Sequence, residues 1–162
     1  MHSLIAVLTE ALTKHEAAAS AFAYADQLVE EGEFDYYNRR SELYNLSGRT
    51  YRLTSKAGGL LVAEALRANR TEFDQALKAA RHMLSHCTDE QLYQDDIPPD
   101  PTRDYWASRY QFAILGGMTH DCYLYGEPQV WGGKIQNDRE YAAATNGHEA
   151  DNLWVTAIDF HH

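Results

Sequence analysis

The first thirty residues carry small and apolar side chains at alternating steps of four and three positions. The series is Leu4, Leu8, Ala11, His15, Ala18, Phe22, Ala25 and Val29. This spacing aligns the side chains along one face of a helix. Ser3 can cap the start of such a helix and Gly32 can end it. The pattern therefore predicts a long first helix that packs against another helix of the same chain.

Residues 34–69 continue with helical spacing, and Gly48 and the pair Gly58 and Gly59 predict breaks in it. Within this stretch, RTYRLTS is also compatible with a short strand. A further helix is predicted to begin after Thr71, because the apolar positions that follow share one stripe. These positions are Phe73, Leu77, Ala80, Leu84 and Cys87.

The rest of the chain mixes shorter signals. TDEQ, residues 88–91, has capping-box spacing and predicts a short helix. The proline-rich QDDIPPDP predicts a linker, and Pro101 at its end favours the start of a helix that carries Trp106, Tyr110 and Ile114. Beyond it, MTHDCYLY and LWVTAIDF read as strands and DREYAAAT as a helix.

Together these patterns predict a mainly α fold. We expect an N-terminal helical bundle over residues 1–94, a linker over 95–101, and a smaller C-terminal α+β part over 102–162 packed on the bundle. A single continuous domain is the alternative. The 162 residues include 44% hydrophobic and 23% charged positions, which is typical of an ordinary globular protein and not of a disordered one.

The sequence excludes several classes of protein. No window approaches the roughly 20 apolar residues of a membrane-spanning helix, so we expect no membrane partner. Cys87 and Cys122 form no CxxC motif, which suits a reducing cytoplasm, and no cofactor-binding motif occurs, so no cofactor is expected. The formal net charge of −10 favours a basic partner over direct nucleic-acid binding.

Two acidic clusters support the hypothesis that we favour from the sequence. One comprises Glu30, Glu31, Glu33 and Asp35, and the other Asp95, Asp96, Asp100 and Asp104. Carboxylates at the end of a helix oppose its dipole, so their presence there hints at a use. The clusters predict a non-enzymatic acidic module that binds a basic protein surface. Such a module would mimic nucleic acid and inhibit a nucleic-acid-binding protein, in the manner of phage or mobile-element anti-defence proteins.

A basic segment suggests an alternative function. Residues 38–81 hold nine bases and four acids, and residues 36–56 interleave tyrosines with arginines. Arginine with aromatic side chains is the mixture used to bind single-stranded nucleic acid. The candidate residues are Arg39, Arg40, Tyr44, Arg49 and Arg52. The competing interpretation is that these arginines pair with acids elsewhere in the fold.

The histidines and cysteines give two further candidates. His82 and His86 have the i, i+4 spacing of zinc ligands, but Lys78 lies on the same face, so we predict no metal site there. His120 and Cys122 share one face of a predicted strand, which makes a small cytosolic enzyme with a Cys/His site the other alternative. A buried, inert Cys122 is the simpler interpretation, and an enzyme is not favoured.

Overall fold

The computed structural model describes residues 2–93 and 122–161. The elements are β1 (His2–Glu10), α1 (Lys14–Glu30), β2 (Tyr36–Asn38), β3 (Thr50–Arg52), α2 (Lys56–His86), α3 (Asp89–Tyr93), β4 (Leu124–Gly126), β5 (Gly133–Lys134), α5 (Asp138–Thr145), the 3-10 turn η1 (Ala150–Asn152) and β6 (Leu153–His161). The chain divides into two units, residues 1–69 with 122–162, and residues 70–121. The first unit contains every described strand.

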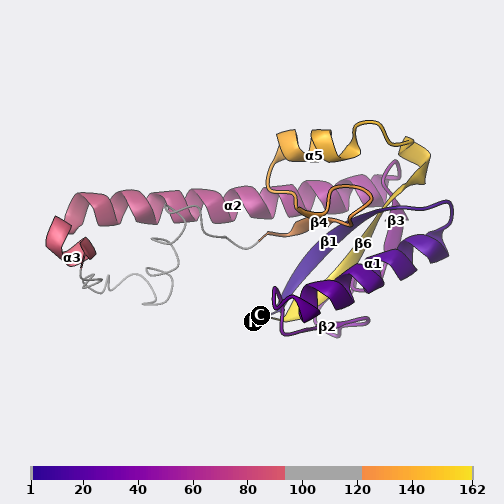
Figure 1. The fold of residues 1–162 in the computed structure, drawn as a ribbon, viewed down its shortest axis with the longest axis horizontal. Helices are drawn as coiled ribbons and strands as arrows, with labels where there is room; N and C mark the ends of the chain where they lie inside the picture. Colours follow the sequence, from indigo (N-terminus) through magenta and orange to yellow (C-terminus); the bar gives the residue numbers. More distant parts are fainter. Residues whose placement is uncertain (1, 94–121, 162) are drawn as a thin grey trace. The chain divides into compact units, whose positions relative to one another are not determined.

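One mixed sheet organises the first unit (Figure 1). Its order is β2-β6-β1-β4-β5, and β3 also pairs with β6. Strands β1 and β6 are antiparallel along their whole length, from His2 opposite His161 to Glu10 opposite Leu153. Strand β4 lies parallel to β1. The beginning and the end of the described chain therefore lie side by side in the middle of the sheet.

This sheet corrects the predicted fold class. A mainly α fold with an N-terminal helical bundle is wrong, because the protein is a mixed α+β fold with a six-stranded sheet. The error begins at residues 2–10, where the predicted first helix is strand β1. A run of apolar residues suits a buried strand as well as a buried helix, and here both faces of the strand are covered.

Helix α1 occupies only the second part of the predicted first helix. Thr13 and Glu16 form a capping box at its start, with the Thr13 side chain accepting from the Glu16 N–H and the Glu16 carboxylate accepting from the Thr13 N–H. The predicted stop at Gly32 is confirmed, since this residue adopts a φ of 77° just beyond the helix. The buried residues are Ala17, Ala21, Tyr24, Ala25 and Leu28; Ala25 was predicted, and each of the others lies one position before a predicted residue.

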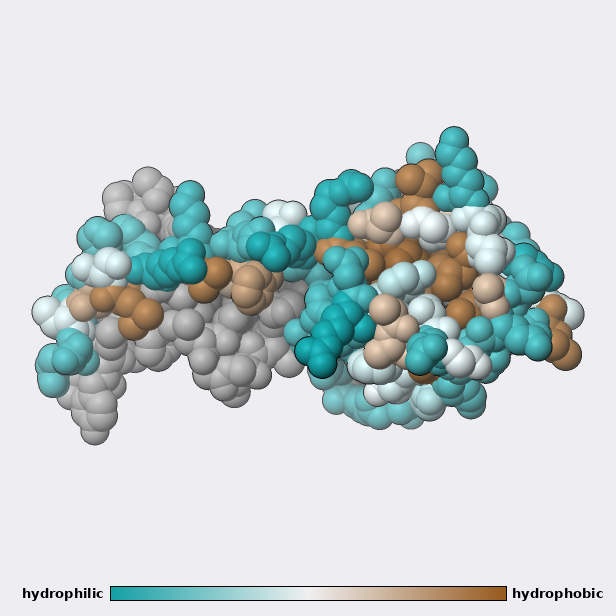
Figure 2. Space-filling view, turned by 90° about the horizontal axis from the view of Figure 1, so that it is seen from above, coloured by the Kyte–Doolittle hydropathy of each residue, from teal (hydrophilic) through white to brown (hydrophobic). Residues whose placement is uncertain are grey.

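The sheet separates two hydrophobic clusters. On one face, Ile5 and Val7 of β1 and Ile158 of β6 pack with the buried stripe of α1. On the other face, Ala6 and Leu8 pack with Leu61, Val62 and Ala65 from the first part of α2, and with Ala144 of α5. Seen from the α5 side, apolar side chains gather near the middle of this unit, with hydrophilic ones around them (Figure 2). Because consecutive residues point to opposite faces, an unbroken apolar run fills both clusters.

Helix α2 runs through Gly58 and Gly59, so the breaks predicted there are wrong. Gly58 is required by packing, because a Cβ at this position would lie 2.1 Å from the carbonyl oxygen of Arg52. Farther along, Asn69 is buried; its amide donates to the Ile135 carbonyl at 2.9 Å and accepts from the Tyr123 N–H at 2.7 Å. These bonds join α2 to the strand β4 region.

Three other local predictions are confirmed. The helix predicted from DREYAAAT and the strand predicted from LWVTAIDF are confirmed as α5 and β6. The capping box at Thr88 is also confirmed, since the side chains of Thr88 and Gln91 each bond the backbone N–H of the other before α3. The predicted linker at 95–101 and the helix with Trp106 lie outside the described residues.

Candidate functional site

The loop of residues 39–49, called the arginine loop below, lies at the edge of the sheet. It connects β2 and β3, which pair with two successive parts of β6. The returning end of the loop is fixed by backbone bonds between Gly48 N–H and the Ala157 carbonyl at 2.7 Å, and between Ala157 N–H and the Arg49 carbonyl at 3.0 Å. Residues 39–49 therefore form a loop that interrupts one edge strand, of which β2 and β3 are the two parts.

Gly48 allows the two ends of the loop to meet. Its φ of 76° is strained for any residue with a side chain. A Cβ at Gly48 would also lie 2.2 Å from the carbonyl oxygen of Arg39. The glycine predicted as a helix break is instead the closing residue of the loop.

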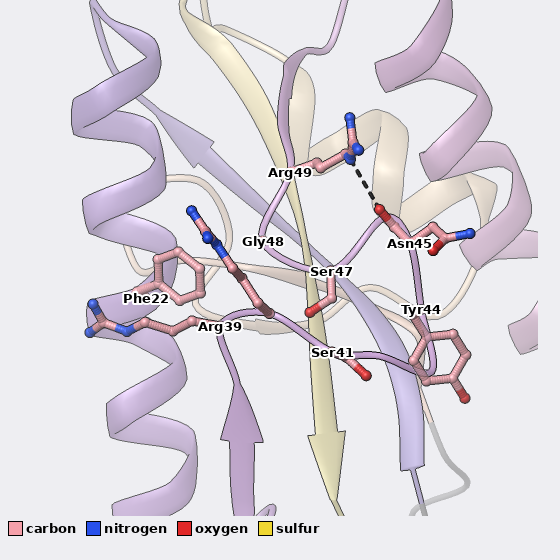
Figure 3. Close-up of a pocket in the computed structure, with 9 residues that line it drawn as sticks. Phe22, Arg39, Ser41, Tyr44, Asn45, Ser47, Gly48 and Arg49 are labelled. Carbon is pink, nitrogen blue, oxygen red and sulfur yellow. Dashed lines mark hydrogen bonds between the residues drawn. The ribbon is translucent and has the colours of Figure 1, made fainter.

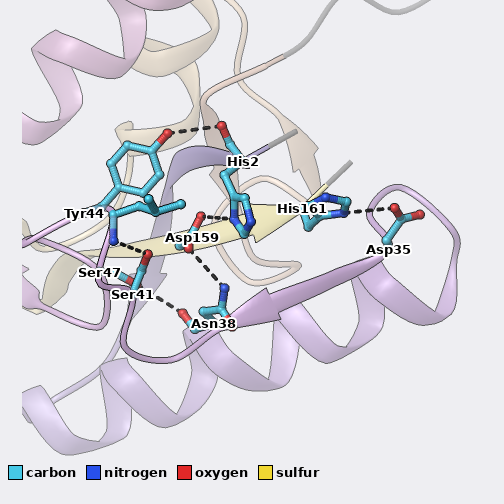
Figure 4. Close-up of polar contacts among 9 residues, drawn as sticks. His2, Asp35, Asn38, Ser41, Tyr44, Ser47, Asp159 and His161 are labelled. Carbon is cyan, nitrogen blue, oxygen red and sulfur yellow. Dashed lines mark hydrogen bonds and ion pairs between the residues drawn. The ribbon is translucent and has the colours of Figure 1, made fainter.

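Side-chain bonds hold the loop from within the fold (Figure 4). The Ser47 hydroxyl donates to the Asn38 carbonyl at 3.1 Å, and the Tyr44 hydroxyl donates to the His2 carbonyl at 3.1 Å. Ser47 is buried, whereas Tyr44 is partly exposed. The loop is thus fastened to β1 and β2 and held in one conformation, which lowers the cost of ordering it around a ligand.

Asp159 lies beneath these contacts and is fully buried. Its carboxylate accepts from His2 Nδ1 at 3.0 Å and from Asn38 Nδ2 at 3.1 Å. Burial by itself raises the pKa of Asp159, but the hydrogen bonds from Ser41, Asn38 and His2 outweigh it, so the pKa lies below its usual value. A buried carboxylate therefore anchors the start of the arginine loop to both central strands.

The outer side of the loop encloses a pocket of about 640 Å³ (Figure 3). We call it the arginine pocket, because three of its lining residues are arginines. The lining residues are Phe22, Arg39, Arg40, Ser41, Tyr44, Asn45, Ser47, Gly48 and Arg49. Phe22 comes from α1, and all the others come from the arginine loop. Four of the five residues that the sequence grouped as nucleic-acid ligands meet here.

Arg39 and Arg49 contact neutral groups. Arg39 lies over the Phe22 ring, with Cζ 5.0 Å from its centroid. Arg49 donates from Nε to the Asn45 carbonyl at 3.0 Å. Among the residues that the structure describes, no ion pair joins Arg39, Arg40 or Arg49 to a carboxylate. The interpretation that these arginines pair with acids elsewhere therefore fails for these three among the described residues, whereas Arg52 does have such a partner.

Arg52, the fifth predicted residue, behaves differently. Its guanidinium lies 4.8 Å from the Trp154 ring centroid and donates to the Asp151 carbonyl at 2.6 Å. It also forms an ion pair with the Asp151 carboxylate at 3.9 Å. Arg52 therefore supports the fold near the end of β3 and does not line the pocket.

The first acidic cluster is exposed but partly engaged. Glu33 pairs with Lys134 at 2.6 Å, and Asp35 pairs with His161 at 3.1 Å. Glu31 accepts from the Gln27 amide at 2.7 Å, one turn earlier in α1. The second cluster, comprising Asp95, Asp96, Asp100 and Asp104, lies outside the described residues. Glu30 and Glu31 are the members without an ion pair to a described cation.

Among the described residues, the other predicted ones do not assemble into a site. His82 and His86 stack with ring centroids 4.1 Å apart, and His86 Nδ1 lies 2.8 Å from the His82 carbonyl. Cys122 is buried, its thiol bonded to the Leu124 and Ile135 carbonyls, and burial raises its pKa. A raised pKa leaves less of the nucleophilic thiolate. His120, its proposed partner, lies outside the described residues.

The sequence did not predict one cluster of polar side chains. Glu10 at the end of β1 pairs with His148 at 3.0 Å, and Glu127 accepts from the Glu10 N–H at 2.9 Å. Burial raises the pKa of Glu127. No local signal connects these residues, because the parallel pairing of β1 with β4 brings them together. The cluster ties the ends of two central strands.

Comparisons with known proteins do not assign the chain to a family. No family model matches the chain, no curated protein is similar to it, and no solved structure matches its fold. Among the described helices, none is long and apolar enough to cross a membrane.

Proposed function

We propose that this protein is a binding module that holds a phosphate-bearing ligand in the arginine pocket. The observation that carries the proposal is that Arg39, Arg40 and Arg49 all line one pocket and none has a described carboxylate partner. Like charges gathered in one place repel each other, so an anion that enters the pocket is stabilised. The rigid fork of guanidinium donors matches phosphate oxygens better than any other side chain.

The setting of the pocket supports the proposal. The chain carries a net charge of −10, so this basic hollow stands out against an acidic protein. The loop that presents the arginines is fastened by Tyr44, Ser47 and the buried Asp159. A binding site built on a rigid support retains more of its interaction energy when the ligand binds.

Of the hypotheses drawn from the sequence, nucleic-acid binding is now favoured over the binding of a basic protein. Binding of nucleic acid through the tyrosine- and arginine-rich segment gains support, because four of its five residues line one pocket. Fewer carboxylates of the first acidic cluster are available to bind a basic partner than the sequence suggested, since Glu33 and Asp35 have intramolecular partners. The acidic-inhibitor function therefore stays a separate prediction.

Calorimetric titration of the full chain with inorganic phosphate and with pyrophosphate tests the proposal. We expect saturable binding that the substitution Arg40→Ala weakens by about tenfold or more. A hydrogen bond to a charged group is worth about 1.5–3 kcal/mol, and about 1.4 kcal/mol is a factor of ten.

The matched control is Arg52→Ala, which removes the same charge from the same segment but outside the pocket lining. It should leave the affinity within a factor of two or three of the parent. Absence of saturation by either anion at millimolar concentration would overturn the proposed function. So would an equal loss of affinity in both variants, which would indicate unspecific attraction by net charge.

A further inference from the structure

The size and boundaries of the arginine pocket limit the ligand. A volume of about 640 Å³ lies within the usual range of roughly 300–1,000 Å³ for small-molecule sites. Its lining comes from one loop and from Phe22 of α1. The pocket is therefore matched to a small molecule or to the end of a chain, and less to a strand that crosses the surface.

The charge outside the pocket also favours a small ligand over a long polyanion. A long polyanion gains affinity by placing many backbone phosphates on many basic side chains. This chain has a net charge of −10, and exposed carboxylates lie nearby, including Glu42 on the loop and Asp26 on α1. Phosphates that extend beyond the pocket meet repulsion, whereas a single phosphate inside it lies among residues that include Arg40 and Arg49. A doubly charged phosphomonoester gains more from them than a singly charged diester does.

A stack of planar groups borders the pocket. The Tyr37 and Phe22 rings lie 5.9 Å apart with an interplanar angle of 21°. Arg39 covers Phe22, its Cζ 5.0 Å from the ring centroid. Phe22 and Arg39 both line the pocket, and a nucleobase can stack on such groups because aromatic rings and guanidinium planes are among the surfaces on which bases stack.

We infer that the ligand is a nucleotide with a terminal phosphomonoester, its phosphate held by Arg40 and Arg49 and its base stacked on Arg39. This inference rests on the proposed function and adds the class of ligand. The same chemistry occurs in a free mononucleotide and in the phosphorylated end of a single strand. Both sources are therefore included in the test.

The experiment is a calorimetric titration of the full chain with adenosine monophosphate, adenosine and ribose 5-phosphate. We expect adenosine to bind at least 100-fold more weakly than adenosine monophosphate, because it lacks the phosphate. Ribose 5-phosphate should bind about tenfold more weakly, since stacking of one base on a side chain is worth about that factor or more. Equal affinities of ribose 5-phosphate and adenosine monophosphate would overturn the stacking part of the inference.

A second set of probes compares single-stranded DNA decamers with a phosphate at the 5′ end, at the 3′ end or at neither end. At least tenfold tighter binding of a phosphorylated decamer identifies a strand end as a source. Binding of the mononucleotide alone identifies a free nucleotide. Equal, saturable binding of all three decamers would show recognition of the diester backbone. That result would overturn the inference and leave the proposed function standing, whereas failure of inorganic phosphate and pyrophosphate would remove both.

The variant Arg39→Lys separates stacking from charge. Lysine keeps the positive charge but has no planar guanidinium. We expect its affinity for adenosine monophosphate to fall about tenfold while its affinity for ribose 5-phosphate stays within a factor of two or three. Arg40→Ala should weaken both ligands by a similar factor. A parallel loss of both ligands in Arg39→Lys would contradict the assignment of the base to Arg39.

Discussion

The Nδ1 atom of His2 lies 3.0 Å from Oδ1 of Asp159, although the two residues are 157 positions apart in the sequence. The pair joins the first and the last strand where the arginine loop begins. His2 is partly exposed, whereas Asp159 is fully buried. His2 also accepts the Tyr44 hydroxyl bond through its carbonyl, so one residue links the buried carboxylate to the loop.

The substitution Asp159→Asn should lower the free energy of unfolding near neutral pH by about 2 kcal/mol, because the charge-assisted hydrogen bonds from His2 and Asn38 are lost. The pKa of Asp159 is lower in the folded state than its usual value of 3.8. Its contribution to stability is therefore present above about pH 4 and is lost as the pH falls toward the folded pKa. Urea denaturation between pH 3 and pH 7 measures both effects.

Asp35→Asn is the control for this prediction. Asp35 also pairs with a histidine, at 3.1 Å, but its side chain is 66% exposed. Exposed ion pairs contribute about 0–1 kcal/mol, so this variant should differ little from the parent. Equal destabilisation by the two variants would contradict the anchoring role of Asp159.

The substitution Gly48→Ala should destabilise the fold and abolish binding in the arginine pocket. Two costs add, since the alanine must adopt a φ of 76° and its Cβ would lie 2.2 Å from the Arg39 carbonyl oxygen. Backbone strain of this kind costs about 1–3 kcal/mol before the clash is counted. Thermal unfolding and phosphate titration of the variant check the two effects.

Gly32→Ala separates strain from the clash. Gly32 has a φ of 77°, but a Cβ at this position would meet no atom within 4 Å. We expect a loss of about 1 kcal/mol and unchanged phosphate binding. If Gly48→Ala were no worse than Gly32→Ala, the close approach of the loop ends would have no energetic importance.

The two cysteines should differ in reactivity toward iodoacetamide at neutral pH. Cys122 is buried with a raised pKa, whereas Cys87 is partly exposed. We expect alkylation of Cys87 in the folded protein and of both residues in denaturant, as measured by mass spectrometry of peptides. Rapid alkylation of Cys122 in the folded state would instead favour the Cys/His enzyme that the sequence raised as an alternative.

Replacing Glu30 and Glu31 by lysine tests the acidic-inhibitor function. Both lie at the C-terminal end of α1, where carboxylates oppose the helix dipole, so the double variant should be as stable as the parent or about 0.5 kcal/mol more stable. If these carboxylates bind a basic protein, capture of that protein from a nuclease-treated bacterial lysate should be lost. Undiminished capture by a folded double variant would exclude the pair from the interface.

The local sequence by itself determined several parts of this protein. The capping box at Thr88, the helix at Asp138–Thr145 and the strand at Leu153–His161 follow from neighbouring side chains and were predicted correctly. Gly32 ends the first helix as its conformational freedom predicts. These features depend on contacts within a few residues, and short-range patterns encode such contacts.

The tertiary structure decided the rest. Residues 2–10 could bury their apolar side chains as a helix or as a strand. Pairing with β6 satisfies the backbone hydrogen bonds of the strand, and α1 on one face and α2 with α5 on the other cover its side chains. The charge pattern marked Arg39, Arg40 and Arg49 but could not separate them from Arg52. The closure at Gly48 and the anchor at Asp159 gather the first three in one pocket, and both depend on contacts between residues far apart in the chain.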